Sequence, residues 1–209
     1  MASPVIATGY ISDIDRDCGQ HGETEWNLQK KIQGTTDTEL TNKGIAQAID
    51  VAHYLKNKQW DRIITSPLKR AMQTAEIIAE ELKIKNMENW KEFQEREYGQ
   101  ATGMYLEEYT NFINKYALVQ GWENNQALRA RVLIGLEKII KFYSKERIIL
   151  ISHGVPIMSI INFIKEQPYN PDIFQIRNGS ISTIYYSMQS WNIEHLNITT
   201  HLKEGHRLS

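Results

Sequence analysis

A strand followed by a helix is encoded in residues 62–82, R-I-I-T-S-P-L-K-R-A-M-Q-T-A-E-I-I-A-E-E-L. The apolar run at 62–65 is rich in β-branched residues, which is typical of a buried strand. Ser66 and Pro67 follow it as a helix N-cap and first helical residue, so we expect a helix over 68–82. A strand that passes directly into an amphipathic helix is the building unit of an α/β sheet.

The same order of elements recurs elsewhere in the chain. The run R-I-I-L-I-S at 147–152 predicts a second buried strand, and Pro156 lies near the start of a helix that ends at about Lys165. The other expected elements are a helix over 42–58 capped by Thr41, a helix over 124–143, and strands at 181–187 and 193–199. This alternation predicts a single domain over 1–209, an α/β three-layer sandwich with a mostly parallel central sheet and helices on both faces. Residues 100–125 fit no strand–helix unit, and we expect them to form a small helical cap.

Composition restricts the class of protein. The 209 residues carry 24 Lys and Arg against 25 Asp and Glu, a balance that argues against a nucleic-acid-binding protein. No apolar run approaches the roughly 18–20 residues that cross a bilayer, and the first eleven residues lack the features of a signal peptide. A single cysteine, Cys18, fits a reducing cytoplasm. We expect a cytoplasmic protein with no nucleic-acid or membrane partner, and nothing in the sequence indicates its oligomeric state.

Two histidines are each followed by glycine, in the pairs His21-Gly22 and His153-Gly154. His153 comes directly after the expected strand at 147–152, and α/β sheets gather ligands at the carboxyl ends of their strands. The glycine lets the backbone approach a ligand closely. One such histidine is most often a packing residue, but two His-Gly pairs with Arg70 on a helix between them indicate a functional site.

Five sequence blocks occur in an order that matches a known family. They are H-G-E-T-E-W-N (21–27), Q-G-T-T-D-T-E-L-T-N-K-G (33–44), S-P-L-K-R-A-M-Q-T-A (66–75), E-R-E-Y-G (95–99) and S-H-G (152–154). Together they resemble the histidine phosphatase superfamily, which has the phosphoglycerate-mutase-like fold, over roughly nine-tenths of the chain. The resemblance implies a phosphomonoesterase that acts on a small phosphorylated metabolite and needs neither a cofactor nor a metal.

The resemblance also implies a role for each of four residues. His21 would attack phosphorus to form a phosphohistidine, and Glu95 would protonate the leaving alcohol and then activate water. Arg70 would clamp phosphate oxygens with its planar fork, and His153, protonated beside the dianion, would stabilise their charge. The further phosphate- or substrate-binding residues that it implies are Gln20, Gly22, Thr24, Asn27, Gly34, Thr35, Tyr98, Gly154, Asn178 and Ser180.

The sequence departs from the family pattern immediately before His21. The family's first block is Arg-His-Gly, whereas Gln20 stands here in place of the arginine. Glutamine carries no charge and cannot hold a phosphate bidentately, and an arginine that serves phosphoryl transfer can contribute about 10³–10⁵ in rate. Arg16 is an alternative source of the missing charge. We therefore expect impaired turnover, and a catalytically weak or dead domain that only binds a phospho-ligand is the alternative function.

Segment 12–19 is also unlike the buried central strand of the family. Its three aspartates within 13–17 cannot be buried unpaired in a sheet without a large cost. Residues 5–11 are therefore expected to supply the strand, which leaves 12–19 as a loop that displaces His21 from the strand end. The alternatives are an error in the sequence or divergence that abolished catalysis.

Two further expectations concern residues 102–112. Tyr105, Tyr109 and Phe112 are spaced for one helix face, which either roofs the pocket or packs within the cap. Thr102-Gly103 replaces the family's second acidic-glycine pair, so a glutamate that supports the first loop is missing.

A phosphoglycerate mutase is the less favoured enzyme. Mutases of the family use an arginine-rich insertion, whereas residues 100–126 contain one cationic residue, Lys115.

Near the C-terminus, the spacing of His195, His201 and His206 favours a solvated tail over a metal site.

Overall fold

A six-stranded sheet in the order β3-β2-β4-β1-β5-β6 forms the centre of the protein. The computed structural model describes residues 7–11, 21–115, 119–167 and 176–206. The strands are β1 (Ala7–Ile11), β2 (Arg62–Thr65), β3 (Met87–Asn89), β4 (Ile148–Ile151), β5 (Ser180–Ser187) and β6 (Ser190–Ile198). The first four pair in parallel, while β5 runs antiparallel to both β1 and β6. The predicted mostly parallel α/β sheet is therefore confirmed.

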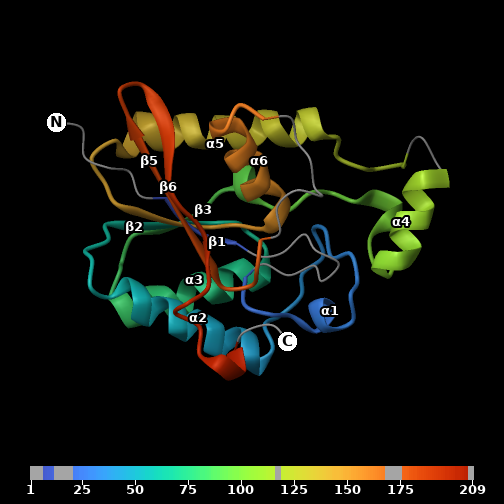
Figure 1. Ribbon diagram of the computed structural model, residues 1–209, viewed down its shortest axis with the longest axis horizontal. Helices are drawn as coiled ribbons and strands as arrows, with labels where there is room; N and C mark the ends of the chain where they lie inside the picture. The colour runs from blue at the N-terminus through green and yellow to red at the C-terminus, as the bar shows by residue number, and fades with distance from the viewer. Residues whose placement is uncertain (1–6, 12–20, 116–118, 168–175, 207–209) are drawn as a thin grey trace.

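Two pairs of long helices cover the sheet, one pair on each face (Figure 1). The helices are α2 (Asn42–Leu55) and α3 (Lys69–Leu82) on one face, and α5 (Asn125–Tyr143) and α6 (Gly154–Ile164) on the other. Neighbouring strand residues serve opposite faces: Ile63 packs in the core beside α2 and α3, and Ile64 in the core beside α5. Successive side chains of a strand point to opposite sides, so a strand buried on both faces is apolar throughout.

The remaining elements are short. They are α1 (Glu25–Leu28), α4 (Leu106–Lys115) and the 3₁₀ turns η1 (Lys91–Phe93), η2 (Gly99–Ala101) and η3 (Glu204–His206). The helix α4 falls within the range 100–125, where a helical cap is expected, and it lies to one side of the sheet (Figure 1). Among the described helices, none has the length and apolarity of a segment that spans a bilayer.

The start of α3 differs from the prediction. The helix begins at Lys69 with Leu68 as its N-cap, so Ser66 and Pro67 precede it. The reason is that Ser66 still belongs to the sheet edge, where its N–H donates to the carbonyl of Ile151 at 2.8 Å. Its side chain accepts from the Leu68 N–H and thereby shapes the turn into the helix.

The other helix boundaries agree more closely with the sequence. Thr41 caps α2 as predicted, because its hydroxyl accepts from the Gly44 N–H at 3.1 Å, although the helix ends at Leu55 rather than near residue 58. The strand expected within 5–11 is confirmed as β1, which lies between β4 and β5. Segment 12–19 and Gln20 lie outside the described residues.

The C-terminal segment packs on α2, which corrects the expectation of a solvated tail. Leu202 is buried, His201 bonds the carbonyl of Gly179 at 2.8 Å, and His206 bonds Asp50 at 2.6 Å. His195 is exposed, but it belongs to β6 rather than to a tail. The burial of Leu202 against α2 and Gly179 is what fixes the polar residues around it.

Removal of core volume from α5 tests the assignment of its buried face. Leu136 is 1% exposed and Ile134 is 51% exposed on the same helix. We expect Leu136→Ala to lower the free energy of unfolding by about 2–5 kcal/mol, because it leaves a cavity between α5 and the sheet. Ile134→Ala is the matched control, with a change of about 0.5 kcal/mol or less. Urea unfolding measures both, and equal losses would contradict the assignment.

Candidate active site

The site begins where β2 and β4 end at the same edge of the sheet. Ser66 follows β2 and His153 follows β4, and the Ser66 hydroxyl lies 2.6 Å from His153 Nε2. Ser152 donates from its hydroxyl to the carbonyl of Phe93 at 2.6 Å, which fixes the end of β4. The carboxyl ends of parallel strands meet at one edge, so the position predicted for His153 is where α/β sheets bind ligands.

His21 lies beside His153 and is completely buried. The two rings meet edge to face with their centroids 5.5 Å apart. His21 Nδ1 lies 2.7 Å from the carbonyl oxygen of Gly22, and a carbonyl only accepts, so Nδ1 carries the ring proton. Among the described residues, Nε2 has no hydrogen-bond partner. The ring therefore presents a buried lone pair at Nε2, which is the form that a nucleophilic histidine requires.

The surroundings keep both histidines neutral. Burial first and the charge of Arg70 second hold the pKa of His21 well below its ordinary value of 6.5. Burial, Arg70 and His21, in that order, lower the pKa of His153 in the same way. The expectation of a protonated His153 refers to a ring beside a phosphate dianion, whereas the protein groups around it favour the neutral form.

Arg70 supplies the positive charge of the site from the first turn of α3. Its side chain is 1% exposed and donates to the carbonyls of Gly34 and Thr36, both at 2.8 Å. Burial lowers its pKa to about 10, so it remains a cation at neutral pH. Its Nε has no partner among the described residues and is free to donate to an anion. Gly34 has φ +54°, and this left-handed turn places its carbonyl against the guanidinium.

The turn after His21 is organised by Thr24 and Asn27. Thr24 caps α1, and its hydroxyl lies within donating distance of two side-chain oxygens, Asn27 Oδ1 at 2.9 Å and Gln33 Oε1 at 3.1 Å. The side-chain nitrogen Nδ2 of Asn27 has no partner among the described residues, although the residue is buried. Asn27 therefore holds a donor for an anion, whereas Thr24 makes its bonds within the turn.

Glu95 lies buried directly after η1. Its carboxylate accepts from the Arg96 N–H at 2.6 Å, and its own carbonyl accepts from Arg131 at 3.2 Å. Arg131 also donates to the carbonyl of Gln94 at 2.7 Å, so one guanidinium fixes this stretch of backbone. Sequence reasoning did not single out Arg131, because it is contributed by α5, far along the chain.

The loop at 34–36 does not lack a supporting carboxylate. Thr35 donates from its hydroxyl to Glu97 at 2.5 Å, and Glu97 also accepts from the Gly99 N–H at 3.0 Å. Glu97 thus supports the loop at 34–36, and the effect expected from Thr102 in place of a glutamate stays a prediction. The Thr35 hydroxyl, which is predicted to bind phosphate or substrate, therefore donates to Glu97.

The remaining predicted residues hold the surroundings of the site. Asn178 donates to the main-chain carbonyl of His21 at 3.1 Å, so it fixes the histidine backbone. The N–H of buried Ser180 donates to the carbonyl of Arg177 at 3.0 Å, and buried Gly154 begins α6. Tyr98 meets Tyr109 of α4 edge to face at 5.7 Å, which orients that face of α4 toward the loop after Glu95.

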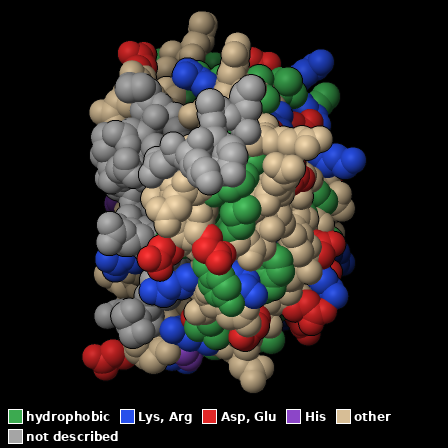
Figure 2. Space-filling model, turned by 90° about the vertical axis from the view of Figure 1, so that its right-hand side faces the viewer, with side chains coloured by type: hydrophobic (Ala, Val, Ile, Leu, Met, Phe, Trp, Pro, Cys, Tyr) green, Lys and Arg blue, Asp and Glu red, His purple; other side chains and the backbone are tan. Residues whose placement is uncertain are grey.

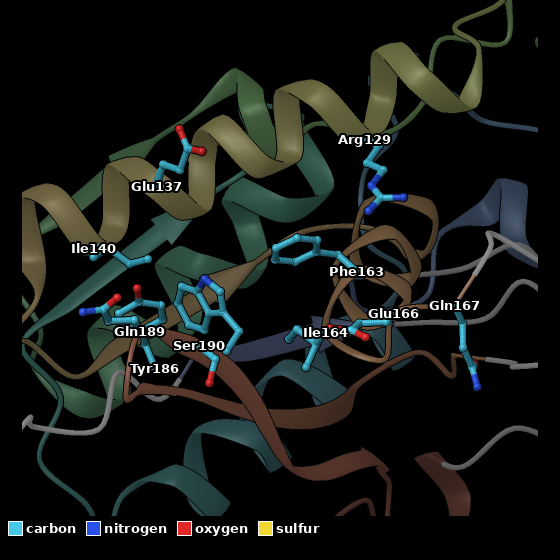
Figure 3. A pocket seen from close by; sticks show the side chains of 11 residues that line it. Arg129, Glu137, Ile140, Phe163, Ile164, Glu166, Gln167, Tyr186, Gln189 and Ser190 are labelled. Atoms are coloured by element: carbon cyan, nitrogen blue, oxygen red, sulfur yellow. The ribbon is translucent and has the colours of Figure 1, made fainter.

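A separate hollow of about 670 Å³ lies between α5, the end of α6 and the β5–β6 hairpin (Figure 3). Phe163 and Ile164 at the end of α6 line it, together with Trp191 of β6. His153 stands at the opposite end of α6. Eleven helical residues span about 16 Å, so this hollow is distinct from the site around the two histidines.

Comparison with known proteins gives one family match and three similar proteins. The model of the histidine phosphatase superfamily (branch 1) matches residues 20–199. The Bacillus subtilis protein named Uncharacterized phosphatase PhoE is 38% identical over 185 residues, which cover 88% of this chain and 94% of that protein. The solved structure of Bacillus stearothermophilus YhfR has a TM-score of 0.82 at 22% identity and covers 94% of this chain and 100% of its own. Entamoeba histolytica phosphoserine phosphatase, solved in complex with 3-phosphoglyceric acid, has a TM-score of 0.77 at 30% identity, covering 96% and 100%.

Two buried neutral histidines make stability depend on pH. The unfolded chain protonates each ring as pH falls through about 6.5, while the folded protein takes up these protons only at lower pH. Because the unfolded state binds more protons, each ring lowers the free energy of unfolding by up to about 1.4 kcal/mol at pH 5.5, and by nearly nothing above pH 7.5.

Urea unfolding at pH 7.5 and 5.5 measures this effect. We expect His153→Ala to reduce the loss of stability between the two pH values by up to about 1.4 kcal/mol. His195→Ala, which removes an exposed histidine, should leave the loss unchanged. An undiminished loss in His153→Ala would show that this ring is not held neutral.

Proposed function

Since the chain belongs to the histidine phosphatase superfamily, branch 1, we propose that it hydrolyses a small phosphate monoester through a phosphohistidine on His21. Its family and its likeness to a Bacillus phosphatase make it a phosphatase enzyme. We further propose that the substrate is small and that the buried residues around His21 act in its hydrolysis.

One observation carries this proposal, namely the state of the His21 ring. Its Nδ1–H is bonded to Gly22, and its Nε2 has no hydrogen-bond partner among the described residues. A neutral imidazole with a buried lone pair is a competent nucleophile at neutral pH. A ring that served only to pack the core would not need the unpartnered donors of Arg70 and Asn27 in the same site.

The proposed reaction has two halves. His21 Nε2 attacks phosphorus, the bond to the ester oxygen breaks, and Glu95 gives that oxygen its proton, so the alcohol leaves. A water molecule then attacks the phosphohistidine, Glu95 takes a proton from the water, and the N–P bond breaks to release inorganic phosphate. Arg70 and the Asn27 amide hold the phosphate oxygens, and His153 stabilises their charge once it gains a proton beside the dianion.

Charge on the cap side favours a phosphatase over a mutase. The sequence over 100–126 holds one cationic residue, Lys115 at the end of α4, and so has no arginine cluster for a substrate carboxylate. On the face that α4 presents, acidic and basic side chains are interspersed and neither forms an extended patch among the described residues (Figure 2). A small monoester without a second anionic group fits these surroundings.

Substitution of the proposed nucleophile tests the proposal directly. We expect His21→Ala to abolish hydrolysis of p-nitrophenyl phosphate, because it removes the Nε2 lone pair that attacks phosphorus in the proposed mechanism. His195→Ala, which removes an exposed histidine, should hydrolyse at the rate of the unmodified protein. Steady-state rates between pH 5 and 8 measure both variants. Sustained turnover by His21→Ala would refute the proposed mechanism.

Gln20 provides a second test, because we propose that it limits the rate. An arginine in this place would add a cation that shares the charge of the transferring phosphoryl group. We expect Gln20→Arg to raise kcat by about 10³ or more. A rate that stays unchanged in an active protein would show that Arg70 suffices. If neither form turns over although each binds inorganic phosphate, the alternative of a binding domain is correct.

A further inference from the structure

One peptide unit joins the His21 side chain to α2. The carbonyl oxygen of Gly22 accepts from His21 Nδ1 at 2.7 Å, and the N–H of Glu23 donates to Gln47 Oε1 at 2.9 Å. These two groups belong to the same peptide bond, which is planar. Gln47 therefore determines the direction in which the Gly22 carbonyl points.

The amide of Gln47 has only one orientation that satisfies its partners. Its Oε1 faces the Glu23 N–H, and its Nε2 donates to the main-chain carbonyl of His206 at 2.8 Å. A main-chain N–H only donates and a carbonyl only accepts, so a flipped amide would lose both bonds. Gln47 is completely buried, and such a loss would leave polar groups unpaired in the protein interior.

The C-terminal segment is fixed on α2 beside this contact. Asp50, which lies one turn after Gln47, accepts from His206 Nδ1 at 2.6 Å and from the Lys203 N–H at 3.0 Å. Leu202 is buried in the core cluster that also contains Val51 of α2. The carbonyl of His206 is thus held in place by the contacts that Leu202, Lys203 and His206 make with α2.

The backbone around His21 is packed too closely to adjust freely. A Cβ on Gly22 would lie 2.1 Å from the carbonyl oxygen of Gly44 in α2, so the two backbones are in direct contact. The 21–22 peptide is held as well, because the His21 carbonyl accepts from the Asn178 side chain and the Gly22 N–H donates to Thr74 at 3.3 Å. Both peptide units that follow His21 are therefore fixed by side chains.

We propose that Gln47 is a positioning residue for the nucleophile, and that the C-terminal segment 202–206 fixes the Gln47 amide by accepting its N–H at the His206 carbonyl. Gln47 holds the 22–23 peptide with its carbonyl toward His21, which keeps the proton on Nδ1 and the lone pair on Nε2. Without this bond the Glu23 N–H loses its acceptor on Gln47, and the Gly22 carbonyl can tilt away from Nδ1 within the limits of its packing against Gly44. The ring proton can then reside on Nε2, where it blocks attack. This inference rests on the proposed function of His21.

The first test replaces Gln47 by leucine, which has a similar volume and makes neither bond. We expect kcat for p-nitrophenyl phosphate to fall about tenfold or more, with KM changed less than twofold, because misorientation of a catalytic group costs rate rather than binding. Long-range ¹H–¹⁵N spectra of the histidine rings should show one tautomer of His21 in the unmodified protein and a mixture in Gln47→Leu. The His21→Ala spectrum identifies the resonances.

A matched control separates positioning from loss of stability. Leu136→Ala removes a buried group from α5, in the core cluster on the opposite face of the sheet from Gln47 and Leu202. We expect it to lower stability while kcat and the His21 tautomer stay as in the unmodified protein. An equal loss of kcat in Leu136→Ala would overturn the inference.

Gln47→Glu gives a test that does not depend on the folding of the leucine variant. A protonated carboxyl group can accept from Glu23 and donate to His206, as the amide does, whereas a carboxylate repels the His206 carbonyl. Burial raises the pKa of a carboxyl group, so we expect the kcat of Gln47→Glu, relative to the unmodified protein, to increase at least fivefold from pH 7.5 to 5.5.

The outcomes distinguish the two proposals. Full kcat and a single His21 tautomer in Gln47→Leu, or a pH-independent ratio in Gln47→Glu, would overturn the role of Gln47 while His21→Ala remains inactive. Sustained turnover by His21→Ala would instead refute the proposed function itself, whatever Gln47 does.

Discussion

The hydrogen bond from His21 Nδ1 to the carbonyl of Gly22 is the interaction on which the proposed chemistry depends. It places the single proton of a neutral ring on the nitrogen that faces the backbone and leaves Nε2 with its lone pair. Burial and the nearby charge of Arg70 prevent a second proton from binding at neutral pH. Because Nε2 carries no proton at neutral pH, it needs no separate base to activate it as a nucleophile.

The sheet topology brings the other groups to this ring. The parallel strands β2 and β4 end at one edge, and the turns that follow them carry Ser66, Arg70 and His153. Arg70 acts in two ways at once, because its charge lowers the pKa of both histidines and also attracts a phosphate dianion. Binding of that dianion reverses the effect on His153, so the same ring can be neutral before binding and charged during the reaction.

Most of the sheet and the ends of several helices could be predicted from local pattern. The buried run at 62–65 is β2 as expected, and the cap at Thr41 is confirmed, because both depend on neighbouring residues only. Contacts between distant residues could not be predicted. Gln47 and His206 are 159 positions apart, and nothing in the polar C-terminal sequence indicates that buried Leu202 fixes it on α2. The hydrogen bond between Thr35 and Glu97, 62 positions apart, is another contact of this kind.

Trapping the phosphorylated enzyme tests the central claim most directly. The protein is mixed with a ³²P-labelled monoester, quenched in alkali, where phosphohistidine survives, and digested to locate the label. A ³¹P spectrum of the labelled peptide then distinguishes the two ring nitrogens. We expect phosphate on His21 at Nε2, since Nδ1 is bonded to Gly22. Label on Nδ1 or on another residue, or none during active turnover, would contradict it.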